Sequence, residues 1–105
     1  MVTTYNKLVR DRIPERIRSS GGTAAITVLS DAAYRDALDR KLGEELAEYL
    51  AEGDVAELAD LLEVMLAVCE TRGVDAEALE AMRRAKAEKN GRFAQRLFLV
   101  NGEMD

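Results

Sequence analysis

The fold is decided by one stretch of the sequence, KLGEELAEYLAEGDVAELAD, at residues 41–60. Its centre, Gly53-Asp54, interrupts a helical pattern on both sides, because glycine commonly ends one helix and aspartate caps the start of the next. Four acidic residues lie at matching distances from this turn, about one helical turn away on each side and then about two. The inner pair is Glu48 and Glu57, and the outer pair is Glu45 and Asp60. The pattern predicts an antiparallel helix hairpin in which four carboxylates point at one spot.

These carboxylates predict a metal site, because like charges at short range repel and a hard divalent cation with oxygen ligands would hold them together. Other interpretations remain open. An EExxE run on a helix is usually a solvated face, Lys41 and Glu45 have the spacing of a surface ion pair, and Glu57 stands at the N3 position of a capping box begun by Asp54. Asp60 favours the metal site over these interpretations, because aspartate is a poor helix-interior residue and this one stands where the helix becomes strongly apolar.

Composition narrows the functional classes. The chain has 105 residues and a net charge of −5, which predicts one domain over 1–105 and argues against nucleic acid as a partner. Without histidine it lacks the commonest general base and the commonest transition-metal ligand. The single cysteine, Cys69, excludes an internal disulfide and fits a reducing compartment. Since the pattern contains no signal peptide and no membrane-length apolar stretch, we expect a soluble, cytoplasmic protein without a membrane partner.

Helix signals along the rest of the chain predict an all-α bundle. A short helix is expected from Pro14 to Gly21-Gly22, and Ser30 or Asp31 caps the first hairpin helix. The second hairpin helix is expected to run from Asp54 to about Thr71, and a fourth helix from Asp75 to about Asn90. The β-prone run Ala24 to Leu29 allows one short strand.

The second half of the third helix predicts an oligomer. Leu61 to Cys69 is apolar nearly all round, and a domain this small can scarcely bury such a helix alone. A homodimer or a higher homo-oligomer is therefore expected. Glu63 interrupts this run and would need a partner, either an arginine or the acidic site. The apolar tail from Phe93 to Val100 is expected to dock onto the body or onto a partner subunit.

Four short motifs follow one another along nearly the whole chain. YNKLVRDRIP opens it at residues 5–14, EExxE lies at 44–48, ExxD at 57–60, and KAEKNGRF closes it at 86–93. In this order they resemble the MazG-like, "KLVRDKIPE"-type branch of the all-α NTP pyrophosphatase superfamily, which is also similar to phosphoribosyl-ATP pyrophosphohydrolase. One departure is that the stretch between EExxE and ExxD is shorter than in many members, which bears on the size of the substrate pocket.

The resemblance implies hydrolysis of a nucleoside triphosphate to the monophosphate and pyrophosphate with Mg²⁺, or Mn²⁺ as an alternative, and a house-cleaning role toward non-canonical nucleotides. By position, the metal ligands would be Glu45, Glu48, Glu57 and Asp60. The same positions give Glu44, Glu45 and Glu48 as catalytic residues, with Glu44 as a ligand or a residue that orients the attacking water. The nucleotide contacts would be Lys86, Lys89, Asn90 and Arg92. The opening residues Lys7, Val9, Arg10 and Asp11 match the family without an assigned role.

Two alternatives stay open. The first is phosphoribosyl-ATP pyrophosphohydrolase activity, which cleaves the same type of bond in a different nucleotide. The second is a non-catalytic helical module for dimerisation or nucleotide binding, which the apolar third helix and tail would equally serve. Convergence of the acids distinguishes the two classes, because a scaffold gains nothing from gathering like charges at one point.

Overall fold

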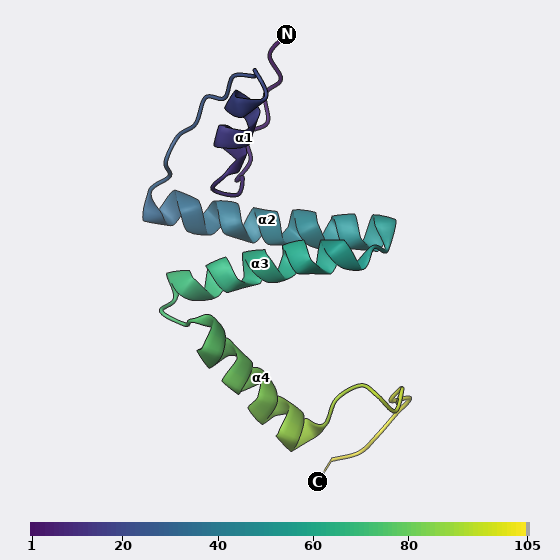
Figure 1. Cartoon of the computed structure of the whole chain (residues 1–105). Coiled ribbons are helices and arrows are strands. Elements are labelled where there is room, and N and C mark those ends of the chain that lie inside the picture. Colours follow the sequence, from purple (N-terminus) through teal and green to yellow (C-terminus); the bar gives the residue numbers. More distant parts are fainter. Residues whose placement is uncertain (105) are drawn as a thin grey trace.

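The computed structural model describes residues 1–104, and in this range it contains four α-helices and no strand. They are α1 (Ile13–Ser19), α2 (Asp31–Glu52), α3 (Val55–Thr71) and α4 (Ala76–Asn90). Figure 1 shows α2 and α3 lying side by side as a hairpin, with α1 and α4 on opposite sides of it. The all-α fold and the hairpin are therefore confirmed.

The optional strand at Ala24–Leu29 is wrong, because this segment is irregular. No other strand is present in residues 1–104 to complete its backbone hydrogen bonds, and a strand needs such a partner. Instead, Arg18 of α1 donates a side-chain hydrogen bond to the Ala24 carbonyl oxygen at 2.8 Å. The segment is thus a connection that remains attached to α1.

Capping residues explain where the longer helices begin. Ser30 Oγ accepts a hydrogen bond from the Ala33 amide at 3.3 Å, and Asp54 Oδ1 accepts one from the Ala56 amide at 2.9 Å. These bonds satisfy amide groups that have no partner inside the helix. Between the two hairpin helices, Gly53 adopts a φ of 71°, a left-handed conformation that glycine adopts without steric cost. The local signals of the sequence therefore fix the hairpin turn.

The small core of the described residues lies in the hairpin. Within residues 1–104, only two apolar side chains are buried, Leu38 of α2 at 4% exposure and Val64 of α3 at 9%. The leucines of α2 recur every four residues, and each such step moves about 40° further round the helix. Toward the turn at Gly53, the leucines therefore no longer point into the hairpin contact. Leu46 and Leu50 are consequently exposed.

The molecule is extended, with a radius of gyration of 18.6 Å. A compact domain of this length would have about 13 Å. The extension comes largely from α4 and residues 91–100, together called the arm, which project away from the hairpin (Figure 1). The predicted burial of Leu61 to Cys69 is not achieved within the single chain: of its members only Val64 is buried, and Leu62 and Met65 are exposed. Glu63 is exposed as well and needs no partner here.

No helix among the described residues combines the length and apolar character that crossing a membrane requires.

Candidate metal centre

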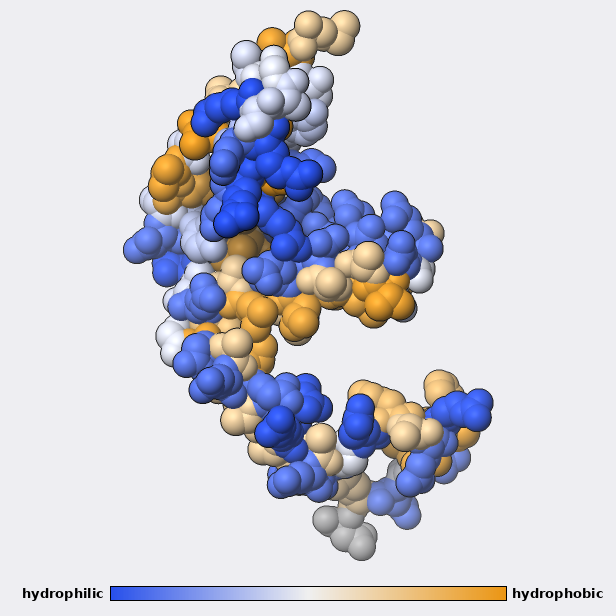
Figure 2. Space-filling model, in the orientation of Figure 1, coloured by the Kyte–Doolittle hydropathy of each residue, from blue (hydrophilic) through white to orange (hydrophobic). Residues whose placement is uncertain are grey.

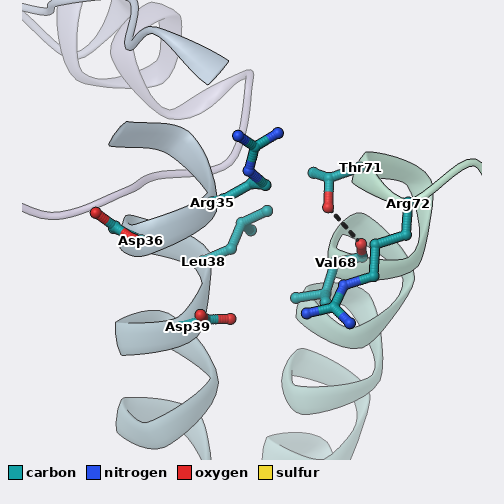
Figure 3. A pocket seen from close by; sticks show the side chains of 7 residues that line it. All are labelled: Arg35, Asp36, Leu38, Asp39, Val68, Thr71 and Arg72. Atoms are coloured by element: carbon teal, nitrogen blue, oxygen red, sulfur yellow. Dashed lines mark hydrogen bonds between the residues drawn. The ribbon is translucent and has the colours of Figure 1, made fainter. Parts of the chain in front are cut away.

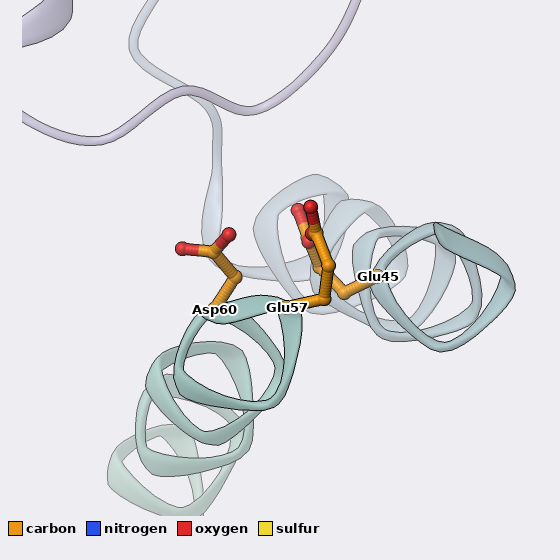
Figure 4. Close-up of side chains that lie close together, drawn as sticks. All are labelled: Glu45, Glu57 and Asp60. Carbon is orange, nitrogen blue, oxygen red and sulfur yellow. The ribbon is translucent and has the colours of Figure 1, made fainter. Parts of the chain in front are cut away.

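Three carboxylates from the two hairpin helices meet at one place. Glu45 comes from α2, and Glu57 and Asp60 come from α3. One oxygen from each lies within 4.8 Å of the others. In Figure 4 the Glu45 and Glu57 side chains lie next to each other and point the same way, with Asp60 beside them. Three of the four acids predicted from the turn symmetry therefore converge, and we call them the acid cluster.

Glu45 is the buried member of the acid cluster, with only 6% of its surface exposed. Lys41, one turn earlier on α2, places its Nζ 3.3 Å from Glu45 Oε1. The expected surface ion pair therefore forms, although its acidic partner is buried. Glu45 Oε2 is buried without any hydrogen-bond partner among residues 1–104. A buried carboxylate oxygen without a partner is destabilising, so this atom has an unused capacity to bind a donor or a cation.

Glu57 lies where desolvation and neighbouring acids both disfavour an ionised carboxylate. Its pKa is raised from 4.5 to about 7, first by desolvation, then by a hydrogen bond with Glu52 and the charges of Glu52, Glu48 and Asp60. The alternative of a capping box is not realised, because no hydrogen bond joins its carboxyl group to the Asp54 amide within the described chain. A cation at this position would replace the proton that Glu57 retains near neutral pH.

Asp60 already has a cationic partner. Arg10, from the segment before α1, donates a hydrogen bond from Nη2 to Asp60 Oδ1 at 2.6 Å. Both side chains are partly exposed. The sequence placed Arg10 in the opening motif without a role, and its contact with a residue 50 positions away carries no local signal. The structure thus joins the opening motif to the acid cluster.

The other predicted acids lie outside the cluster. Glu48 is exposed, although its charge contributes to the raised pKa of Glu57. Glu44 is half-buried and pairs with Lys41 at 3.7 Å. The symmetry argument placed Glu48 correctly along the helix, but its side chain points more toward solvent than that of Glu45.

The predicted nucleotide contacts are on the arm, away from the acids. All four are exposed, and none makes an ion pair with the acid cluster in residues 1–104: Lys86, Lys89, Asn90 and Arg92. Lys7 and Asp11 of the opening motif are also exposed. A single chain therefore brings together the metal-ligand candidates but not the predicted phosphate ligands.

The acid cluster fits a hard divalent cation. Its donors are carboxylate oxygens, which Mg²⁺ and Mn²⁺ prefer over nitrogen or sulfur. Glu45 Oε2 has no hydrogen-bond partner among residues 1–104, and desolvation followed by neighbouring acids raises the pKa of Glu57. Both carboxylates would therefore be stabilised by a bound cation. Glu45, Glu57 and Asp60 are therefore the residues that would hold such an ion.

A hollow at the opposite end of the hairpin is a weaker candidate. It has a volume of about 230 Å³ and lies between Arg35 and Asp39 of α2 and Val68 and Arg72 near the end of α3 (Figure 3). Small-molecule pockets usually measure about 300–1,000 Å³. Arg35, Asp36 and Asp39 come from α2 and Arg72 follows α3, and these charged groups do not converge on one point in Figure 3.

Comparisons with known proteins give a partial relative. Over 45 residues the chain is 62% identical to an uncharacterized protein of Mycolicibacterium smegmatis, a match that covers 43% of this chain and 46% of that protein. The chain thus spans less than half of the relative it matches. No family model matches the chain. No solved structure matches it either.

Proposed function

We propose that the protein is a Mg²⁺-dependent nucleoside triphosphate pyrophosphohydrolase, which releases pyrophosphate and a nucleoside monophosphate. The observation that carries the proposal is the acid cluster with its buried, unpartnered Glu45 Oε2. Three acids at one place repel one another, which is unfavourable unless a cation compensates their negative charge. The order of motifs along the chain supports the same reaction.

Three groups of residues have different proposed roles in the reaction. Glu45, Glu57 and Asp60 hold the ion, which when bound would neutralise charge on phosphate oxygens and lower the pKa of an attacking water. Glu44 and Glu48 flank the cluster on α2 and can accept the proton of that water, a role that requires no histidine. Basic groups then stabilise the leaving pyrophosphate, with Lys86, Lys89 and Arg92 as candidates.

A non-catalytic dimerisation module is the second candidate. It is favoured by the large exposed apolar side chains on the hairpin and the arm. It does not account for the convergence of Glu45, Glu57 and Asp60, which has no use in a scaffold. A cytoplasmic location is part of the first proposal, since the one cysteine is unpaired and intracellular nucleotides are its substrate class.

The test is an assay of the full chain against canonical NTPs, dNTPs, damaged NTPs and phosphoribosyl-ATP, each with Mg²⁺ and with EDTA. Pyrophosphate and monophosphate should appear in equal amounts, only with the metal, and most rapidly for one nucleotide class. Preference for phosphoribosyl-ATP would replace the general activity by the more specific one. Release of orthophosphate with a diphosphate product, or no turnover of any substrate by folded protein, would contradict the proposal.

A further inference from the structure

The opening segment, residues 1–12, contacts the hairpin through one ion pair. Arg10 Nη2 lies 2.6 Å from Asp60 Oδ1, and within residues 1–104 no other hydrogen bond or ion pair joins residues 1–29 to the hairpin. The Arg10 carbonyl oxygen accepts a hydrogen bond from the Ile13 amide at 3.0 Å, which ties this residue to the first turn of α1. The position of Arg10 beside the acid cluster is therefore fixed by α1 as well as by Asp60.

The side of the hairpin that faces α1 is polar. Figure 2 shows hydrophilic side chains on this side, whereas apolar surface lies on the opposite side, toward α4. In Figure 4 the carboxylates of the acid cluster point to the side on which the purple trace of the opening residues runs. Residues 7–18 carry five bases and two acids, whereas residues 44–60 carry seven acids and no base. An anion bound beside the acid cluster would therefore find its compensating charge in the opening segment.

Arg10 has a hydrogen-bonding capacity that Asp60 does not use. A guanidinium group carries several N–H donors in a planar fork that matches the oxygens of carboxylates and phosphates. Within residues 1–104 only Nη2 of this side chain makes a hydrogen bond, and 59% of the side chain is exposed. Asp60 in turn uses only Oδ1, so its Oδ2 can ligate an ion while the pair persists. The pair can thus offer an oxygen to a cation and N–H donors to an anion next to it.

Lys41, the other base in contact with the acid cluster, has no comparable freedom. Its Nζ lies 3.3 Å from Glu45 Oε1 and 3.7 Å from Glu44 Oε2, and only 24% of its side chain is exposed. Two acids of its own helix therefore share its charge. The bases of the arm make no ion pair with the acid cluster in residues 1–104. Within this range, Arg10 is the base that combines contact with the cluster and unused donors.

A polyphosphate complexed with Mg²⁺ is the ligand that fits both parts of this site. Glu45 is only 6% exposed, and its unpartnered Oε2 can bind the ion. A pyrophosphate or triphosphate carries more negative charge than one Mg²⁺ neutralises, so a cationic donor next to the ion stabilises it further. Arg10 contacts one of the residues that would hold the ion and is placed to act as this donor.

We infer that Arg10 binds the pyrophosphate portion of the nucleotide, beside the ion held by Glu45, Glu57 and Asp60. The leaving group is thus stabilised from the opening segment of the same chain, by a residue that the sequence motifs left without a role. The inference rests on the proposed function and adds to it a binding residue for the leaving group. Arg10 then acts in opposite directions on two ligands, because its charge repels the bare ion and attracts the anionic Mg²⁺–pyrophosphate complex.

The first test is calorimetry of the full chain with Mg²⁺ alone and with inorganic pyrophosphate in the presence of Mg²⁺. Arg10→Ala should weaken binding of the pyrophosphate complex by about tenfold and should not weaken binding of Mg²⁺ alone. Arg12→Ala is the matched control, since its side chain is exposed and makes no ion pair within residues 1–104. It should change the affinity for the pyrophosphate complex by less than about twofold. Circular dichroism should show the same helix content in all three proteins.

Each contrary result has a distinct meaning. Equal weakening in Arg10→Ala and Arg12→Ala would show that only net charge matters, and would overturn the inference. Weaker binding of Mg²⁺ alone in Arg10→Ala would mean that the arginine orients Asp60, and would overturn it too. The same holds for unchanged binding of the pyrophosphate complex in Arg10→Ala, or for no such binding by wild type. Turnover by wild type separates these results from a failure of the proposed function, because pyrophosphate release does not depend on which base binds the product.

The second test distinguishes a nucleotide from free pyrophosphate as the source of the bound phosphates. The probes are the α,β-methylene analogues of ATP, GTP, CTP and UTP, which are not cleaved at the reacting bond, and the four monophosphates. Arg10→Ala should weaken an analogue that wild type binds by about tenfold and leave the monophosphate unchanged, because the monophosphate lacks the pyrophosphate portion. Weaker binding of the monophosphate with an unchanged analogue would overturn the inference. Binding of pyrophosphate without any analogue would contradict its assignment to a nucleotide.

Discussion

The helices of the hairpin and of the arm have similar caps and ion pairs, yet within residues 1–104 only the hairpin has a core. Aspartate caps α4 as it caps α3, and Glu80 pairs with Arg83 and Arg84 along the arm. The hairpin buries Leu38 and Val64, whereas α4 buries no residue. Caps and ion pairs therefore decide where a helix forms, and only a facing apolar surface decides whether it packs. The hairpin finds that surface within the chain, whereas no residue of the arm is buried.

Two glutamates show the same contrast in electrostatics. Glu57 in the hairpin has its pKa raised to about 7, by desolvation and by neighbouring acids. Glu80 on the arm has its pKa lowered to about 2, chiefly by the hydrogen bond from Arg83. On the arm, Glu80 lies between two arginines that compensate its charge, whereas Glu57 in the hairpin has acids as neighbours. The hairpin is therefore the region where the proposed cation would bind.

The largest effect is expected from Glu45→Gln, which removes the buried charge of the acid cluster. Mg²⁺-dependent pyrophosphate release should fall by at least about a hundredfold, because loss of even an outer contact of a metal site costs about 10–100-fold. Glu48→Gln changes a residue outside the acid cluster and should lower the rate of pyrophosphate release by about tenfold. Activity with varied Mg²⁺ measures both, and circular dichroism should show unchanged helix content. Glu63→Gln, an exposed acid on α3, is the matched control. Near-normal turnover in Glu45→Gln would refute the site.

Because the hairpin has a core and the arm has none, substitutions in the two regions should differ in how their effect on stability depends on protein concentration. Leu38→Ala leaves a cavity in the hairpin and should lower the free energy of unfolding by about 2–4 kcal/mol at any protein concentration. Leu97→Ala on the arm should cost stability only at concentrations where the dimer forms, because an exposed leucine in a single chain contributes little. Urea unfolding at several concentrations measures both. A concentration-independent loss in Leu97→Ala would mean that the arm packs within its own chain.

Local chemistry made the helices and the acid cluster predictable from the sequence. Ser30, Asp54 and Asp75 are caps that act on neighbouring amides, so each helix start follows from residues close in sequence. Glu45, Glu57 and Asp60 followed from their distances to one tight turn. The helical period alone did not exclude Glu48, because side-chain direction also depends on how α2 packs against α3. The Arg10–Asp60 contact spans 50 positions, and no local pattern predicts such a contact.

The raised pKa of Glu57 predicts how stability depends on pH without metal. Because its pKa rises from 4.5 to about 7 on folding, its stabilising contribution is full below 4.5 and is lost as the pH rises through about 7. In EDTA, the melting temperature of wild type should therefore fall relative to Glu57→Gln over this range. Saturating Mg²⁺ should abolish that fall, because the cation compensates the ionised group. A wild type that gains stability relative to Glu57→Gln as the pH rises would contradict the assignment.

Arg10→Ala should have the smallest effect and tests whether the arginine competes with the metal for Asp60. The pair is exposed, with side chains at 59% and 43%, so its removal should change stability by less than about 1 kcal/mol. Without nucleotide, calorimetry should show Mg²⁺ binding tightened by up to about fivefold, because a cation at 2.6 Å from Asp60 Oδ1 has been removed. Arg12→Ala removes the same charge nearby, at a residue whose side chain makes no ion pair within residues 1–104, and corrects for the general field. Equal tightening in both variants would show that only net charge matters. Weaker binding in Arg10→Ala would show instead that the arginine positions Asp60 for the ion.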